Sequence, residues 1–222
     1  MKQALWVLQK DLLIEWRSRS RTVALACFAL TILLIFSFAI GPDTATLRQH
    51  ASAYLWLTVL LSSTLLLARS FQVEFESGAM ETILLAPTAP EAIFYGKALS
   101  NSIQLVGVAL ISLPFVLGLC DATLVESAWR QLLVIVLGCA GLAAPGTLYA
   151  ALTARLMAKQ LLLPLLLFPL VVPCLLATVK ATSLILSGDP MNQINSWLLL
   201  LVAFDVIYWS LCGILFGRAI QP

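Results

Sequence analysis

Four glutamates lie close together in the polar segment 69–97, which separates two long apolar stretches. Phe71 and Phe75 are one helical turn apart and Ile83 falls on the same stripe, so a helix here would be apolar on one face. Gly78 interrupts the run near its middle, and prolines close it. The pattern predicts a short, kinked, amphipathic helix that is held by a partner protein. The glutamates are Glu74, Glu76, Glu81 and Glu91.

Other residues with useful chemistry are few. His50 is the only histidine, which makes it a weak candidate for a haem or metal ligand. The cysteines have neither C-x-x-C nor C-x-x-C-H spacing and are interpreted as small apolar side chains. No G-x-x-x-x-G-K-[ST] motif is present, so the chain cannot hold nucleotide phosphates by that loop. We therefore predict no catalytic residue, no metal site and no directly bound cofactor.

Asp205 lies near the middle of the last apolar stretch. A lone carboxylate at that depth costs about 2.5–3.5 kcal/mol on insertion scales, unless it is protonated or faces a polar cavity. Two explanations stay open. The residue is either a functional intramembrane carboxylate or a neutral carboxyl group hydrogen-bonded to a neighbouring side chain. The available neighbours are Ser62, Ser63, Asn101 and Ser102.

The composition places the chain among membrane proteins. It is 61% hydrophobic and 11% charged, with a mean hydropathy of +0.98, whereas soluble domains carry about a quarter charged residues. We predict an all-α integral membrane protein with a single transmembrane domain over residues 1–222 and a cytoplasmic loop at 69–97. Each span is near the roughly 20 residues that cross the hydrocarbon. The predicted spans are 23–41, 51–68, 98–119, 131–151, 161–185 and 196–217.

The lysines and arginines predict the orientation. If the N-terminus is cytoplasmic, only Arg48, Arg130 and Lys180 of the thirteen basic residues fall on the outer side. This asymmetry follows the positive-inside rule, and it places both termini and the Glu-rich loop in the cytoplasm.

Residues 1–22 precede the first span and are predicted to form an interfacial helix. Leu5, Leu8, Leu12 and Trp16 recur at helical spacing, so they would share an apolar face that lies on the membrane surface. Two roles stay open for this helix, a plain membrane anchor and a helix that also contacts a partner.

Small residues and prolines recur in the last three spans. Small residues permit close approach of helix backbones, and proline bends a helix. Packing within the chain and packing against a second copy both stay open. Packing positions are predicted at Gly138, Gly141, Gly146, Gly213 and Gly217. Bends are predicted at Pro145, Pro164, Pro169 and Pro173.

These residues carry a family resemblance. The pattern Phe71-x-x-Glu74-x-x-x-Gly78-x-Met80-Glu81-x-x-Leu84-Leu85-x-Pro87 resembles the segment between the second and third spans of six-span ABC-2-type (type V) exporter subunits. In that family the segment is the coupling helix that docks on the ATPase. IGP after the first span, GLAAPG in the fourth and the LP…FP…VP run in the fifth resemble the CcmB family over essentially the whole chain.

The resemblance implies a function. CcmB proteins are permease subunits of the haem-handling ABC transporter of cytochrome c biogenesis in the bacterial inner membrane. The family couples ATP hydrolysis by a separate subunit to release of the haem-loaded chaperone CcmE, and an older interpretation is haem export. A generic ABC-2-type exporter of lipid, polysaccharide or drug, and a non-transporting membrane scaffold, are the alternatives.

The resemblance also implies partners and contacts. The ATPase CcmA would bind ATP, while CcmC, CcmD and CcmE would handle haem, and a second copy of the chain would pair in the bilayer; no nucleic acid is implied. Asp205 and His50 gain no support from the family pattern. The residues implied to contact the ATPase are Phe71, Glu74, Phe75, Gly78, Met80, Glu81 and Leu84.

Overall fold

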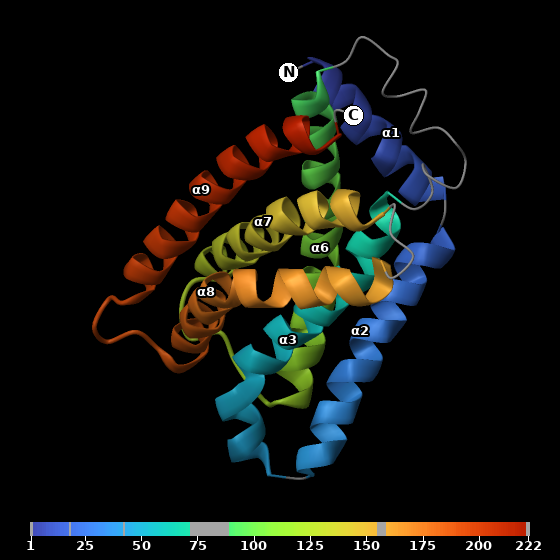
Figure 1. The fold of residues 1–222 in the computed structure, drawn as a ribbon. Coiled ribbons are helices and arrows are strands. Elements are labelled where there is room, and N and C mark those ends of the chain that lie inside the picture. Colours follow the sequence, from blue (N-terminus) through green and yellow to red (C-terminus); the bar gives the residue numbers. More distant parts are fainter. Residues whose placement is uncertain (1, 18, 42, 72–88, 155–158, 221–222) are drawn as a thin grey trace.

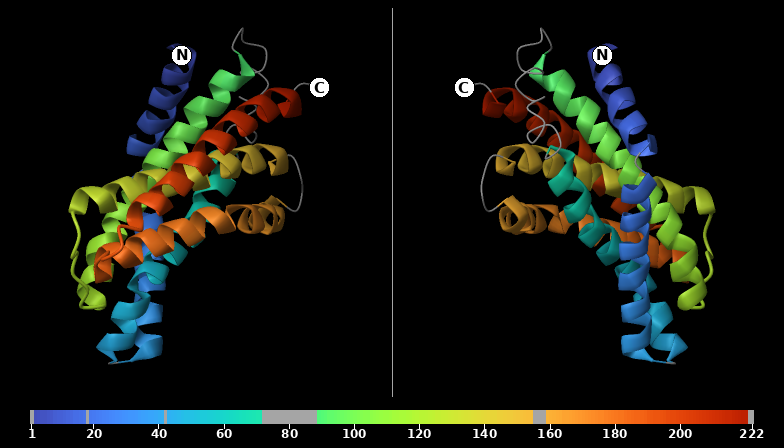
Figure 2. Two further views of the ribbon diagram at one scale, coloured as in Figure 1. Left: turned by 90° about the vertical axis from the view of Figure 1, so that its left-hand side faces the viewer. Right: turned by 90° about the vertical axis from the view of Figure 1, so that its right-hand side faces the viewer.

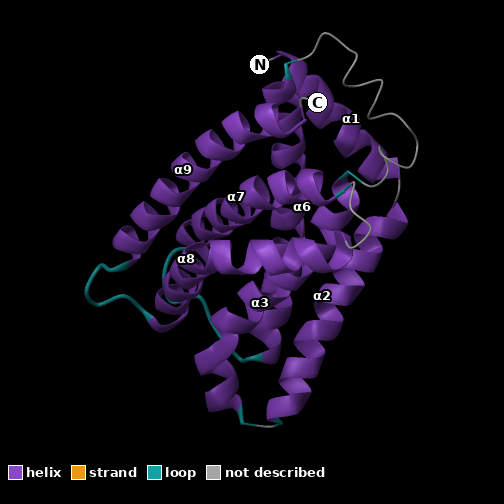
Figure 3. Ribbon diagram, in the orientation of Figure 1, coloured by secondary structure: helices purple, strands orange, loops and turns teal. Residues whose placement is uncertain are grey.

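Helices account for all the regular secondary structure in the part of the chain that the computed structural model describes, namely residues 2–17, 19–41, 43–71, 89–154 and 159–220 (Figure 3). This confirms the predicted all-α class. The helices are α1 (Lys2–Arg17), α2 (Arg19–Ile40), α3 (Thr44–Ser70), α6 (Pro90–Leu119), α7 (Ala128–Thr153), α8 (Lys159–Ser187) and α9 (Ile194–Ile220).

All of these helices except α1, six in number, are long and apolar enough to cross a membrane. Several extend beyond the apolar stretches that hydropathy marks. Thus α3 begins at Thr44 rather than near residue 51, because the Asp43 side chain accepts hydrogen bonds from the backbone N–H groups of Ala45 and Thr46. Similarly, α6 begins at Pro90, a residue that suits the first turn of a helix.

The centre of the bundle is α7, which packs against α3, α6, α8 and α9 (Figure 1). In contrast, α2 lies at the edge, where it packs on α3 and α6. The main core contains apolar side chains from α3, α6, α7, α8 and α9. Close packing of such side chains, rather than exclusion of water, holds helices together in lipid. Members of this core include Trp56, Leu105, Leu142, Leu167 and Leu201.

Hydrogen bonds between buried side chains join the helices at two levels. Trp56 Nε1 on α3 donates to Thr182 Oγ1 on α8 over 2.9 Å. Asn101 Nδ2 on α6 donates to Thr147 Oγ1 on α7, also over 2.9 Å. Bonds of this kind in a bilayer contribute about 0.6–2 kcal/mol each and fix the rotation of one helix against another.

Both termini lie at the end of the bundle where α6 begins, whereas the connection between α2 and α3 lies at the opposite end (Figure 1). Figure 2 shows α1 running beside the first turns of α6 at the terminal end. The polar segment that joins α3 to α6 therefore starts and finishes near α1 and the end of α9. Which side of the membrane this end faces remains a prediction.

Candidate functional site at the base of the polar segment

The polar segment leaves the bundle where α3 ends at Ser70, and it returns at Pro90. We call the surroundings of these two points the loop base; its residues are Asp11, Ser70, Phe71, Phe94, Lys97 and Phe216. Of the predicted ATPase contacts, only Phe71 lies among the described residues. The others, Glu74, Phe75, Gly78, Met80, Glu81 and Leu84, lie outside them.

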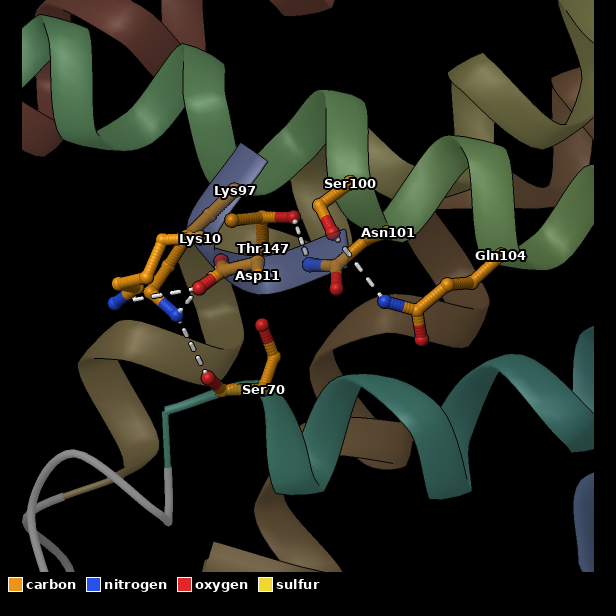
Figure 4. Close-up of polar contacts among 8 residues, drawn as sticks. All are labelled: Lys10, Asp11, Ser70, Lys97, Ser100, Asn101, Gln104 and Thr147. Atoms are coloured by element: carbon orange, nitrogen blue, oxygen red, sulfur yellow. Dashed lines mark hydrogen bonds and ion pairs between the residues drawn. The ribbon is translucent and has the colours of Figure 1, made fainter. Parts of the chain in front are cut away.

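Lys97 is the central residue of the loop base, and its side chain is only 3% exposed. Its Nζ donates to the carbonyl oxygen of Ser70 over 2.9 Å and to Asp11 Oδ2 over 3.4 Å (Figure 4). The same nitrogen lies 4.7 Å from the centroid of the Phe71 ring. A cation at a helix C-terminus satisfies a carbonyl that has no partner within the helix and interacts favourably with the helix dipole. Lys97 thus joins α6 to the end of α3 and to α1.

Aromatic rings attach α9 to the same place. The centroids of Phe71 and Phe216 are 6.1 Å apart, and those of Phe94 and Phe216 are 5.4 Å apart. Seven residues before Phe216 on α9, Trp209 stacks on Tyr95 with ring centroids 6.2 Å apart. Tilted and offset ring pairs at these distances are attractive. Phe71 is 1% exposed, so it anchors the end of α3 inside the bundle, a role different from the predicted contact with an ATPase.

Helix α1 approaches α6 closely at Gly96. A Cβ atom at this position would lie 2.7 Å from Val7 Cβ and 2.8 Å from the carbonyl oxygen of Ala4. Ala4, Val7 and Asp11 share one face of α1 by their spacing, and this face lies on α6. Only glycine permits such an approach without moving one of the helices.

The outward face of α1 differs in part from the prediction. The prediction put Leu5, Leu8 and Leu12 together on a face toward the membrane surface, yet Leu8 and Leu12 are half-buried within the protein. However, Leu5 is 53% exposed and shares the open side with Trp6, which is 76% exposed. The packed stripe is rotated toward Ala4 and Val7 because Gly96 leaves room there. The side chain of Trp16 lies outside the described residues.

Polar contacts continue from the loop base into the span. Gln104 Nε2 donates to Ser100 Oγ over 3.3 Å, one turn below Lys97 on α6. Between them Asn101 bonds to Thr147 of α7 (Figure 4). These residues place hydrogen-bonding groups on the side of α6 that faces the bundle interior.

Asp205 on α9 sits against α7 and α8. Its Oδ1 lies 3.0 Å from the position of a Cβ on Gly141, beside the sulfur of Cys174. Both carboxylate oxygens are buried, and among the described residues neither has a hydrogen-bond partner. The explanation by a hydrogen-bonded serine or asparagine is therefore wrong for these residues. Asn101 donates its hydrogen bond to Thr147, which lies on a different face of α7 from Gly141.

The predicted packing glycines have different surroundings. Gly138 lies under Trp56 and Thr178, and Gly146 lies under Leu67. Gly213 lies under the Tyr95 ring, whereas a Cβ at Gly217 would meet nothing within 4 Å. The first three close approaches are all contacts within the chain.

The predicted bend positions lie inside helices, with Pro145 in α7 and the other three in α8. Figure 2 shows that α8 changes direction along its length. A proline removes a backbone hydrogen bond and clashes with the preceding turn, so a bend is its usual consequence. The residues in α8 are Pro164, Pro169 and Pro173.

Residues that could bind a metal are dispersed. His50 is exposed, and its Nδ1 lies 2.9 Å from the carbonyl oxygen of Thr46. Within the described ranges no three His, Cys, Asp or Glu side chains come together as a metal site. Cys27 is exposed, and the other cysteines are buried and free.

Six apolar helices around a tightly packed core define a multi-pass helical membrane protein. Comparison with protein families narrows this class. The model of the CcmB protein family matches residues 2–221, and the chain belongs to this family. The predicted family is thereby confirmed.

Related proteins support the same family assignment. The chain is 32% identical to heme exporter protein B of Bradyrhizobium diazoefficiens over 186 residues, covering 84% of this chain and 83% of the relative. It is 32% identical to the protein of the same name from Paracoccus denitrificans, covering 85% and 86% of the two chains. For the Rhodobacter capsulatus protein the identity is 33%, with coverage of 77% and 78%.

Proposed function

We propose that this chain is the permease subunit of a haem-handling ABC transporter in the bacterial inner membrane. The observation that carries the proposal is the match to the CcmB family over residues 2–221. Relatives that share about a third of their residues with the chain are named heme exporter protein B. The chain itself is a non-catalytic subunit, so a separate ATPase of the CcmA type supplies the energy.

The polar segment is the coupling helix in this proposal, and the whole chain has ABC-2-type (type V) exporter architecture. The acidic side chains of Glu74 and Glu81 bind a cytoplasmic partner, and residues 74–84 form the docking element. The geometry of the loop base supports this role. Lys97 holds the end of α3 to the first turns of α6, and Phe71 and Phe94 attach both to α9. A push on the segment is therefore applied to several spans at once.

The work done by the complex is the release of the haem-loaded chaperone CcmE, in company with CcmC, CcmD and a second copy of the chain. Nucleotide favours one of two arrangements of the spans, so it must make different contacts in each. Helix bends at Pro145 and in α8 are the places where the spans yield. Export of haem through the subunit is the older interpretation of the same energy coupling.

A charge reversal in the segment tests the coupling. Glu81→Lys places a cation in the acidic docking face, and we expect cytochrome c yield to fall while membrane insertion is unchanged. Glu91→Lys is the matched control, because it makes the same charge change on an exposed residue of α6 outside the docking element. Normal yield from the Glu81 variant would rule out the coupling role.

Purification of the complex separates haem handling from generic export. A haem chaperone that accompanies the chain would carry the Soret absorbance of bound haem. An ATPase without any haem-binding companion would instead favour an exporter of lipid, polysaccharide or drug. Neither an ATPase nor a haem protein in the preparation would favour a scaffold.

A further inference from the structure

We propose that Lys97 is a positioning residue that makes α1 move together with the polar segment. The ion pair between Lys97 and Asp11 attaches α1 to the two ends of that segment, so α1 belongs to the unit that the ATPase displaces. This inference rests on the proposed function, because it concerns how α1 responds to a displacement of the segment by the ATPase.

The first reason is where the Lys97 ammonium group lies. It is bonded to the last carbonyl of α3, where the segment leaves the bundle, while its own backbone belongs to α6 seven residues after Pro90, so it joins the end of α3 to the first turns of α6. Any displacement of the segment that moves either helix end also moves the ammonium group.

The second reason is the burial of the ion pair. The side chains of Lys97 and Asp11 are 3% and 14% exposed. A buried cation that loses its carboxylate keeps the full cost of its desolvation. Separation of α1 from the loop base is therefore unfavourable, and the two move as one body.

The third reason is that the packing of α1 is concentrated at the loop base, apart from a hydrogen bond from Thr22 Oγ1 of α2 to Glu15 Oε1. The helix packs chiefly on α6, at the Gly96 contact and at Lys97 one residue later. Its other side is open, with Trp6 76% exposed and Leu13 61% exposed. An exposed apolar face suits a lipid surface, along which a helix can slide or tilt. The loop base thus determines where α1 lies.

A distance measurement in the assembled complex tests the inference. One spin label is attached at Trp6→Cys on α1, and a second at Val125→Cys, which is 61% exposed in the connection between α6 and α7. Cys27→Ser removes the exposed native cysteine. The complex with its ATPase is reconstituted in lipid, and the distance is measured by pulsed EPR without nucleotide and with a non-hydrolysable ATP analogue.

Four variants isolate the ion pair. Asp11→Asn removes the acidic partner with almost no change of shape, and Lys97→Met removes the ammonium group. Lys97→Arg keeps the charge. Lys10→Met is the matched control, because Lys10 Nζ lies 3.3 Å from the other oxygen of Asp11 but is 43% exposed.

We expect a nucleotide-dependent change of distance in the parent complex, in Lys97→Arg and in Lys10→Met. Asp11→Asn and Lys97→Met should still bind the ATPase but lose this change. An undiminished change in Asp11→Asn would overturn the inference and leave the proposed function intact. A Lys97→Met complex that responds like its parent would overturn it as well. Failure of the parent chain to bind any ATPase would instead refute the proposed function.

Discussion

Lys97 and Asp11 are 86 positions apart in the sequence, yet Lys97 Nζ lies 3.4 Å from Asp11 Oδ2. The pair joins an amphipathic helix at one end of the chain to a transmembrane helix at the base of the polar segment. The nitrogen also bonds to the carbonyl oxygen of Ser70 and faces the Phe71 ring. Three helices are therefore held by one side chain.

Removal of this cation should destabilise the protein. Lys97→Met leaves the Ser70 carbonyl without its partner and Asp11 without its buried one, so we expect a loss of roughly 3 kcal/mol, the lower part of the range for broken buried pairs. Lys10→Met breaks an exposed pair and should cost about 0–1 kcal/mol. Thermal unfolding in detergent compares the two. Equal melting temperatures for the two variants would contradict a structural contribution from Lys97.

Gly96→Ala should separate α1 from α6. The added methyl group would lie within 3 Å of Val7 Cβ and of the Ala4 carbonyl oxygen, where the backbone cannot yield cheaply. We expect a lower melting temperature and easier proteolysis of α1. Gly107→Ala on the same helix is the control, because a Cβ there meets nothing within 4 Å and alanine has the better helix propensity by about 1 kcal/mol. A Gly96 variant as stable as the Gly107 variant would show that the approach of α1 is looser.

The two glycines at the end of α9 should respond differently. At Gly213 a Cβ would lie 2.5 Å from the Tyr95 hydroxyl oxygen, so Gly213→Ala should displace the ring that stacks on Trp209 and lower the melting temperature. Gly217→Ala should leave the single chain unchanged, since its surroundings are open. Chemical crosslinking in membranes then decides the remaining question. Reduced pairing of copies in the Gly217 variant alone would place this glycine at a seam between subunits.

Asp205→Asn tests whether the buried carboxyl group has a function. Both oxygens lack a partner among the described residues, and an ionised group so placed is costly in a bilayer. The isosteric amide should therefore preserve or raise the melting temperature, with cytochrome c yield unchanged. A stable Asp205→Asn protein that no longer supports cytochrome c assembly would make the carboxyl group functional.

Acid should weaken the start of α3 through its cap. Hydrogen bonds from the Thr46 hydroxyl and backbone N–H, and then from Ala45, hold the pKa of Asp43 below its ordinary value of 3.8. A carboxyl group with a lowered pKa stabilises the folded state above that ordinary value, and the contribution disappears as pH falls through the lowered pKa. Asp43→Asn keeps a capping side chain that does not titrate. Its melting temperature should fall less than that of the parent below about pH 4; parallel curves would contradict the assignment.

Hydropathy predicted six spans because apolar runs of this length have few alternatives. It could not predict where α3 begins, since that depends on the Asp43 side chain and not on apolar character. Lys97 illustrates a larger limit of prediction from sequence. In the sequence it counts as one more basic residue at the cytoplasmic end of a span, and nothing local links it to Asp11. The pair exists because Gly96 admits α1 against α6, a tertiary contact with no pattern of its own.

For the polar segment, local sequence is more informative than it is for Lys97. Its alternation of acidic and apolar residues, with Gly78 between them, indicates a docking element from local sequence alone, and membership of the CcmB family supports that interpretation. The sequence pattern groups Phe71 with the docking residues because it continues the apolar stripe. Its burial against Phe216 could be learned only from the arrangement of α3 and α9.

The central claim is that the polar segment is bound by an ATPase on the cytoplasmic side. The direct measurement is affinity purification of the tagged chain from its native membrane, with the ATPase quantified in wild type, Glu81→Lys and Glu91→Lys. Our account predicts that the ATPase accompanies the wild type and the Glu91 variant and is depleted from the Glu81 variant. Equal recovery of the ATPase in all three, or its absence from the wild type, would contradict it.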